Sequence, residues 1–355
     1  MNTIYIKLFY ILTILVSFSS CTKQVKDLWI GKTTSLKSCN LNTNISFLYI
    51  PMDLCVKDSF IITSTYNRNP FFTVYSTNNN NIQELYSFGE KGEGPKDFIF
   101  PTSLRVYDEY IHFYDKALSK YITIESLDNL KMQIKNVQSL GFNNLIKLTN
   151  GDFFGDGFFS DVRFKLIQKE DTVSLKIPYP CKDKTKESIQ TGLAYQGDIN
   201  RNPKRNQFVY TSSYGDIIEI YESTNNGIEQ IFSQQLQYPL YTPQDQNSNE
   251  ISSNLSPECI KSSLCTYVTE KYIYILYSGM TMNNPMHNYS NIVHVYDWQG
   301  NPQKKYILDK HLTCIGIDEH DQFLYGVYWE FDEAKDDETI GFTKYKLDLY
   351  NKQNH

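Results

Sequence analysis

The chain has 355 residues, a formal net charge of -6 and an aromatic content of 15%. A weakly acidic chain without a long basic run lacks the charge pattern of a nucleic-acid-binding protein, so nucleic acid is not an expected partner. The length allows one large β domain or two ordinary domains. The 28 Tyr and 21 Phe favour strands, because aromatic side chains suit a half-buried pleated surface.

The N-terminus has the pattern of a secretory signal. Lys7 supplies a weak positive charge, and the apolar run Leu8–Phe18 follows it. A membrane-spanning helix needs about 20 apolar residues, and this run is shorter. We therefore interpret residues 1–20 as a signal peptide.

Two serines stand directly before Cys21, and this arrangement resembles the lipobox of bacterial lipoproteins. In that interpretation Cys21 is lipidated and residues 21–44 form a tether. An ordinary signal peptide or a chance cysteine is the alternative. Surface-exported lipoproteins of the Bacteroidetes share an acidic patch after the cysteine, whereas residues 22–26 are basic here. We therefore expect an outer-membrane lipoprotein that faces the periplasm.

Short runs rich in Tyr, Ile, Val and Phe recur along the remaining chain, and Asn, Asp and Gly interrupt them. This pattern predicts an all-β protein. The runs group into six units of roughly 40 to 50 residues, the spacing of propeller blades. The predicted strands of the first three units are 59–64, 71–76 and 83–88; 103–107, 110–114, 120–125 and 131–137; and 145–148, 152–155, 162–168 and 173–177. Those of the last three units are 192–198, 207–212, 217–222 and 228–232; 264–268, 272–277, 292–297 and 304–308; and 313–318, 323–328 and 339–347.

The sixth unit is one strand short, and we expect residues 45–50 to supply the missing strand and close the ring. Residues 45–350 then form a six-bladed β-propeller of four-stranded antiparallel blades, and residues 351–355 form a tail. Polar inserts, such as residues 242–257, lie within or between the repeats. They mark no further domain boundary, and we expect a monomer.

The segment Gly89–Phe98 contains three glycines and a proline between two predicted strands. Glycine allows positive φ and Pro95 fixes its own φ, so the segment predicts a built turn. It does not match the glycine patterns of nucleotide-binding loops, and no helix follows it. We therefore predict that it joins two blades and that Phe98 packs inward.

The same loop resembles the Gly-x-x-Gly-x-Gly-Pro-Gly-Glu-Phe pattern of six-bladed propeller lipoproteins of the Bacteroidetes, which are similar to NHL-repeat and TolB-like propellers. Three glycines, Pro95 and Phe98 match, whereas Lys96 replaces a glycine and Asp97 replaces a glutamate. With the lipobox and the blade-like units, the resemblance extends over nearly the whole chain. It implies an architecture and an envelope location, but no particular chemistry.

Six further cysteines leave the disulfide pairing open, because six cysteines allow 15 connectivities. A bridge between Cys259 and Cys265 is one possibility, and buried free thiols are the other. No cysteine pair has the spacing of a zinc site. The aspartates Asp152, Asp156 and Asp161 lack the further ligands of a calcium loop. We therefore predict no metal and no cofactor.

Two groups of residues are candidate ligand-binding positions. Trp329, Glu330 and Asp332 follow a predicted strand, and an aromatic side chain beside acids suits a sugar-binding cleft. Arg105 lies in the first strand of its unit, which in a propeller faces the central channel. A solvated charge run and a structural arginine are the simpler interpretations.

The function that we favour is non-enzymatic binding of a ligand or a protein on a propeller face, because loops on a rigid scaffold carry binding sites. An envelope protein or a glycan is the expected partner, with the membrane contacted through the lipid anchor. The alternative is a carbohydrate-active enzyme, a glycoside hydrolase or lyase, that uses carboxylates near the channel. Acids whose pKa values are pushed apart would favour the enzyme.

Overall fold

The structure is a computed structural model that describes residues 29, 31–78, 80–138, 140–159, 162–169, 171–175, 177, 179, 189–225, 227–243, 253–332 and 337–349. Contacts within the chain separate residues 1–30 from residues 31–355, and the fold is that of the second unit. Among the described residues, no helix is both long and apolar enough to cross a membrane.

Four sheets each contain four consecutive antiparallel strands. Blade 1 has β2 (Asp53–Lys57), β3 (Phe60–Ser64), β4 (Phe72–Asn78) and β5 (Asn81–Phe88). Blade 2 has β6 (Pro101–Tyr107), β7 (Tyr110–Asp115), β8 (Lys120–Ser126) and β9 (Lys131–Asn136). Blade 3 has β10 (Phe142–Lys147), β11 (Phe153–Gly157), β12 (Phe164–Gln168) and β13 (Asp171–Leu175). Blade 4 has β14 (Gly197–Arg201), β15 (Gln207–Ser212), β16 (Asp216–Thr224) and β17 (Gly227–Gln237).

Blades 5 and 6 share one long strand. Their strands are β20 (Ile260–Val268), β21 (Tyr272–Thr281), β22 (Ser290–Asp297), β23 (Pro302–Ile317), β24 (Phe323–Asp332) and β25 (Asp337–Lys346). The first half of β23 pairs with β22 and the second half pairs with β24. The prediction of separate strands at 304–308 and 313–318 was therefore wrong. Residues 309–312 contain no glycine or proline, so the strand passes from one blade to the next without a turn.

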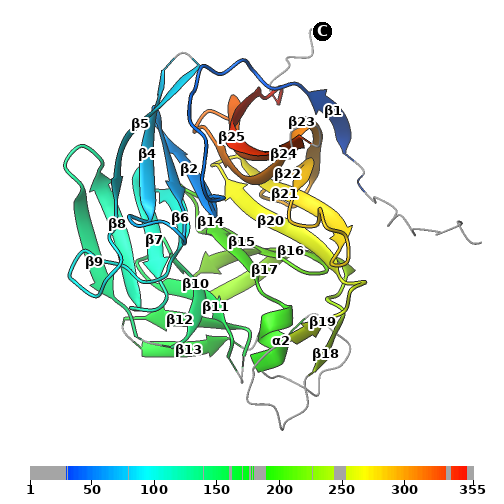
Figure 1. The fold of residues 1–355 in the computed structure, drawn as a ribbon. Helices are drawn as coiled ribbons and strands as arrows, with labels where there is room; N and C mark the ends of the chain where they lie inside the picture. The colour runs from blue at the N-terminus through cyan, green and yellow to red at the C-terminus, as the bar shows by residue number, and fades with distance from the viewer. Residues whose placement is uncertain are drawn as a thin grey trace, which may run out of the picture. The chain divides into compact units, whose positions relative to one another are not determined.

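The first strand of each blade lies beside the first strands of the neighbouring blades. Thus β2 contacts β6 and β23, and β14 contacts β10 and β20. Figure 1 shows the sheets following one another around these inner strands in chain order. The predicted all-β propeller of six blades is confirmed, and the inner strands surround a central channel.

Ring closure uses the N-terminal part of the unit, but not as a regular strand at residues 45–50. That segment is irregular, although the Phe47 amide donates to the Ile340 carbonyl of β25 at 3.0 Å. The Phe47 ring packs edge-on against Phe342 of β25 and Tyr75 of β4, at centroid distances of 4.9 and 6.2 Å. The regular N-terminal strand is β1 (Lys32–Leu36), which pairs in parallel with β23.

The glycine-rich segment joins blade 1 to blade 2, as predicted. Gly89 has a φ of +84°, and an added Cβ would lie 2.8 Å from the ring of Phe72. Phe98 is fully buried and packs edge-on against Phe72 and Phe113. The crossing is tied to the next hairpin by Asp115, whose Oδ2 accepts the amides of Ile99 and Phe100.

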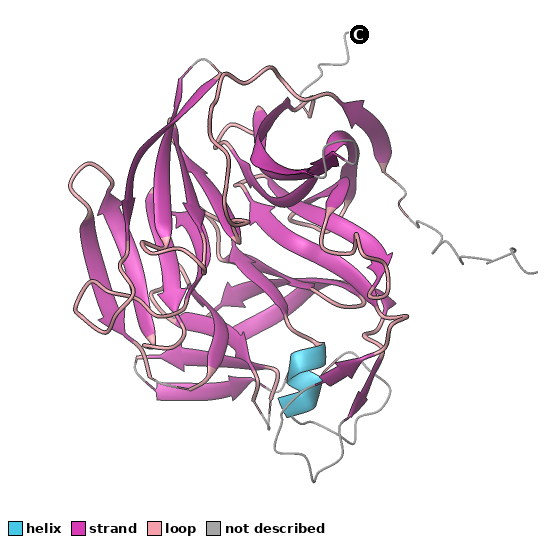
Figure 2. Cartoon of the chain, viewed as in Figure 1, coloured by secondary structure: helices cyan, strands magenta, loops and turns pink. Residues whose placement is uncertain are grey.

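The insert before blade 4 ends in a helix rather than in the predicted strand 192–198. The helix is α2 (Ile189–Ala194), and β14 starts only at Gly197. Figure 2 shows α2 beside the short hairpin of β18 (Tyr241–Pro243) and β19 (Ser253–Leu255). The first residue of β14 has to be a glycine, because a Cβ at position 197 would lie 2.1 Å from the Thr211 carbonyl oxygen.

The described cysteines are free thiols, namely Cys39, Cys55, Cys259, Cys265 and Cys314. The possible Cys259–Cys265 bridge is therefore absent, whereas Cys181 lies outside the described residues. Four of these five thiols are buried. Burial raises the pKa of Cys55, Cys265 and Cys314, so these groups stay protonated and behave as small hydrophobic side chains.

Candidate binding sites at the two ends of the channel

Arg105 lies inside the channel, as predicted from its place in the first strand of blade 2. Its side chain is 7% exposed. Nη1 lies 2.8 Å from Oδ1 of Asp53 on β2, and Nη2 lies 3.9 Å from Oδ1 of Asp198 on β14. Nε also donates to Oδ1 of Asn200 on β14. One guanidinium therefore connects blades 1, 2 and 4 across the channel.

The two carboxylates keep this buried arginine charged. Burial lowers the pKa of the Arg105 guanidinium, but Asp53 and Asp198 together raise it by more. Burial also raises the pKa of Asp198, and Arg105 opposes that shift. A buried ion pair of this kind is costly to break, because removal of one partner leaves the other charge in a poorly solvated place.

The upper mouth is the end of the channel at which the inner strands β2, β6, β10 and β14 begin. It holds a cavity of about 270 Å³. Polar side chains from four blades line it: Asp53, Tyr66, Thr102, Ser103, Arg105, Lys116, Asn143, Asn144, Gln196, Asp198 and Ser213. The sequence separates these residues widely, and only the ring brings them together.

A hydrogen-bonded network supports the floor of the upper mouth. Asn144 accepts a bond from Ser103 Oγ at 3.0 Å and donates from Nδ2 to the Gly197 carbonyl at 2.7 Å. Asp156, behind Asn144, accepts from the backbone amide and the side chain of Asn144, each at 3.0 Å. Burial raises the pKa of Asp156 to about 7, although the bonds from Asn144 oppose the shift.

Lys116 stands at the rim of the upper mouth. Its Nζ donates to Oδ1 of Asn143 at 3.3 Å and lies 4.0 Å from the ring centroid of Phe100. Burial lowers the pKa of this ammonium. The Tyr66 ring packs on Phe100 with a centroid distance of 4.5 Å, so an aromatic pair forms one wall.

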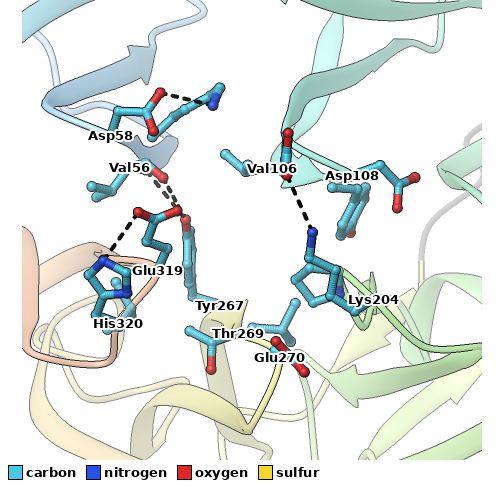
Figure 3. A pocket seen from close by; sticks show the side chains of 16 residues that line it. Val56, Asp58, Val106, Asp108, Lys204, Tyr267, Thr269, Glu270, Glu319 and His320 are labelled. Atoms are coloured by element: carbon cyan, nitrogen blue, oxygen red, sulfur yellow. Dashed lines mark hydrogen bonds and ion pairs between the residues drawn. The ribbon is translucent and has the colours of Figure 1, made fainter.

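The lower mouth lies at the opposite end of the inner strands and holds a larger cavity, of about 440 Å³. Figure 3 shows its labelled side chains around an open space. Part of the wall is apolar or aromatic, formed by Val56, Val106, Tyr107, Pro203, Tyr267, Val268 and Ile317, and polar side chains line the rest. The Tyr267 hydroxyl is fixed by the backbone of Val56, with 3.3 Å to both its amide nitrogen and its carbonyl oxygen.

The rim of the lower mouth has more acids than bases. Its carboxylates are Asp58, Asp108, Glu109, Glu270 and Glu319, and its basic side chains are Lys57, Lys204 and His320. Most of the acids lie in the turns that end the inner strands. Asp58, Asp108 and Glu109 have positive φ values of 52°, 47° and 68°, so the hairpin turns project them past the strand ends.

Several rim charges have partners. Lys57 lies 2.9 Å from Asp58, Lys204 lies 3.6 Å from Glu109, and His320 lies 3.4 Å from Glu319 (Figure 3). The buried Arg201 lies 2.6 Å from Asp108. The pairs of Lys57, Lys204 and His320 lie at the surface and are weak in water. Five carboxylates against Lys57, Lys204 and Arg201 leave the rim with an excess of negative charge.

The acid-rich segment near residue 330 lines neither mouth. Trp329 stacks on Tyr289 at 4.6 Å, and Glu330 lies 2.8 Å from Lys310. Asp332 ends β24, and nothing is described of its side chain. The structure therefore does not bring these residues to Arg105. Cys21, the predicted lipidation position, lies outside the described residues.

Sequence reasoning missed Asp53 and Asp198, although both lie at the start of an inner strand. Their shared place in the repeat is a signal that a closer comparison of the units would have found. The turn acids of the lower mouth share a similar position after the first strand. Among the described residues, no group of three or more His, Cys, Asp or Glu side chains is placed to hold a metal ion.

Comparison with known proteins agrees with this architecture. The family model described as TolB-like 6-blade propeller-like matches residues 30–320. No curated protein matches the sequence significantly. A putative exported protein from Bacteroides fragilis has a similar structure, with a TM-score of 0.50 and 14% identity over 89% of this chain and 100% of that chain. A member of the DUF4221 family from Bacteroides vulgatus gives a TM-score of 0.47 and 11% identity over 86% of this chain and 94% of that chain.

Proposed function

Because the chain belongs to the TolB-like six-blade propeller family, we propose that it is a non-enzymatic binding propeller whose lower mouth takes a ligand with an apolar body and a cationic group. The observation that carries this proposal is the combination of an apolar wall segment and an acid-rich rim around about 440 Å³. Ligand pockets are typically concave and apolar, with a few polar groups that orient the ligand.

The negative charge of the rim determines which sign of charge the ligand should carry. Five carboxylates face two lysines and one histidine there, and the buried Arg201 pairs with one of the five, Asp108. Glu270 is exposed at the rim, and among the described residues the ion-pair partner of Glu319 is the exposed His320. A cation therefore gains Coulomb attraction at this mouth, whereas an anion is repelled.

Phenethylammonium is a suitable probe, because it joins an aromatic ring to one ammonium group. Phenylacetate, of similar size and opposite charge, is the matched control ligand. We expect phenethylammonium to bind more tightly in calorimetric titrations and the double substitution Glu270→Gln/Glu319→Gln to weaken it by roughly threefold to tenfold. Glu84→Gln, on β5 away from the mouth, is the control variant. Equal binding of both ligands, or an unchanged affinity in the double variant, would contradict the proposal.

We also propose that the protein is exported and anchored to the outer membrane, facing the periplasm, by a lipid on Cys21. The sequence pattern of residues 1–26 supports this location. One similar structure is that of a putative exported protein. The substitution Cys21→Ala should move the protein from the membrane fraction to the soluble fraction. A Cys21→Ala protein that stays with the membrane would refute the anchor.

The enzymatic alternative is favoured by one observation at the upper mouth. Asp156 and Asp198 both have a raised pKa, while Asp53 pairs with Arg105. Such differences suit general acid–base chemistry. However, the Asp156 carboxylate already accepts a hydrogen bond from the Asn144 amide, and the Asp198 carboxylate accepts one from the Thr266 amide at 2.9 Å. Release of reducing sugar from soluble polysaccharides, abolished in Asp198→Asn, would establish the enzyme.

A further inference from the structure

The upper mouth differs from the lower mouth in size, lining and charge, and it needs its own explanation. Its cavity of about 270 Å³ is lined mainly by hydrogen-bonding side chains. The arginine at its base spans the channel, because Arg105 reaches Asp53 on one side and Asp198 and Asn200 of β14 on the other. A molecule in this mouth therefore meets a polar floor and does not share the apolar wall segment of the lower mouth.

The formal charges that line the upper mouth cancel. The carboxylates of Asp53 and Asp198 face the cations of Arg105 and Lys116. An ion entering such a site loses its hydration and meets charges of both signs, so it gains little net attraction. A neutral ligand avoids that cost.

The geometry and donor types also select a ligand with several hydroxyl groups. A hydroxyl both donates and accepts, so neighbouring hydroxyls can donate to a carboxylate and accept from an ammonium or an amide. The side chains of Asp53 and Asp198 are 14% and 27% exposed, so solvent reaches both. Lys116 offers donors beside Asn143, and the Tyr66 ring forms an apolar wall.

From these features we infer that the upper mouth is a second binding site, for a neutral polyhydroxylated ligand the size of one sugar ring. Arg105 is a positioning residue in this site, because it fixes the two carboxylates that accept from the ligand. The site is distinct from the one proposed for the cationic ligand at the lower mouth, since the two cavities have no lining residue in common.

Saturation-transfer difference NMR tests this inference, because it detects weak ligands. The probes are glucose, galactose, mannose and N-acetylglucosamine, with glucuronate and glycine as the anionic and zwitterionic controls. We expect saturation transfer to at least one neutral sugar and little to either control. Asp198→Asn keeps an acceptor for the Thr266 amide but removes the charge, and it should weaken sugar binding by about tenfold. Tyr66→Phe should weaken binding less, while leaving the thermal unfolding midpoint unchanged.

The double variant Glu270→Gln/Glu319→Gln of the lower mouth is the matched control, and it should bind the sugar as the unaltered protein does. Three results would overturn the inference. The first would be saturation transfer to no neutral sugar, and the second a charged control that binds as well as the best sugar. The third would be a folded Asp198→Asn protein that binds the sugar with unchanged affinity. Unchanged sugar binding together with weakened phenethylammonium binding in this variant would separate the two sites.

Discussion

Arg105 is the residue on which the centre of the propeller depends. It forms an ion pair with Asp53 at 2.8 Å and reaches β14 on the other side of the channel. Its position in an inner strand could be predicted from the repeat. Its partners could not, because Asp53 and Asp198 lie in other blades and no local pattern connects them.

We predict that Arg105→Leu lowers the free energy of unfolding by roughly 3–5 kcal/mol, the cost of leaving a buried carboxylate without its partner. Urea denaturation measures this change. Arg68→Leu is the matched control, because Arg68 lies 3.4 Å from Glu84 with side chains 38% and 45% exposed. Arg68→Leu should lower the free energy of unfolding by at most about 1 kcal/mol. Similar costs for the two substitutions would argue against a central role for Arg105.

Asp156 gives a prediction on pH. Burial raises its pKa to about 7 from the ordinary 3.8, so the folded state holds this proton more tightly than the unfolded state. The contribution of this group is therefore fully present below about pH 4 and is lost as the pH rises towards 7. Asp156→Asn removes the titration. The thermal unfolding midpoint of the variant minus that of the unaltered protein should therefore increase as the pH rises from 4 to 8. A constant difference across this range would contradict the assignment.

At the scale of elements, the crossing between β5 and β6 has a structural role. The glycine and proline pattern predicted it, since Gly89 adopts a positive φ and Phe98 is buried. This prediction was correct because the conformation of a turn depends on the residues within it. The continuous strand β23 was missed because its change of blade depends on pairing with β22 and β24, which the sequence of 309–312 does not reveal.

Gly89→Ala should lower the free energy of unfolding by roughly 2–4 kcal/mol, through backbone strain and a clash with the Phe72 ring. Gly151→Ala is the matched control, because Gly151 has a φ of +90° but nothing within 4 Å of an added Cβ. We expect it to cost about 1 kcal/mol, from strain alone. Chemical denaturation of the two variants measures the difference. Equal costs would show that packing against Phe72 contributes nothing.

At the scale of the whole molecule, the ring closes through side chains as much as through strands. Phe47 contacts Phe342 of blade 6 and Tyr75 of blade 1. The apolar pattern of residues 45–50 correctly drew attention to this segment. It did not show that one aromatic ring, rather than a strand, makes the contact, because that depends on the shape of the gap between blades.

Phe47→Ala should therefore destabilise the propeller by roughly 2–4 kcal/mol, within the range for truncation of a packed aromatic side chain. The neighbouring Leu48 is 84% exposed, so Leu48→Ala should change stability by less than about 0.5 kcal/mol. Thermal and urea unfolding of both variants provide the comparison. A stable Phe47→Ala protein would mean that the backbone contacts of residues 39–47 close the ring unaided.

The two mouths are the features of the whole molecule that bear on function. Each gathers residues from several blades, so the channel could be predicted from the sequence but the lining of its two ends could not. The lower mouth has an apolar wall segment and an acid-rich rim, and the upper mouth is polar with balanced charges. A crystal structure of the protein soaked with phenethylammonium tests the proposed function most directly. We predict that the aromatic ring lies against Val106 and Tyr267 and that the ammonium lies within hydrogen-bond distance of Glu270 or Glu319. A ligand found elsewhere, with the lower mouth empty, would contradict the proposal.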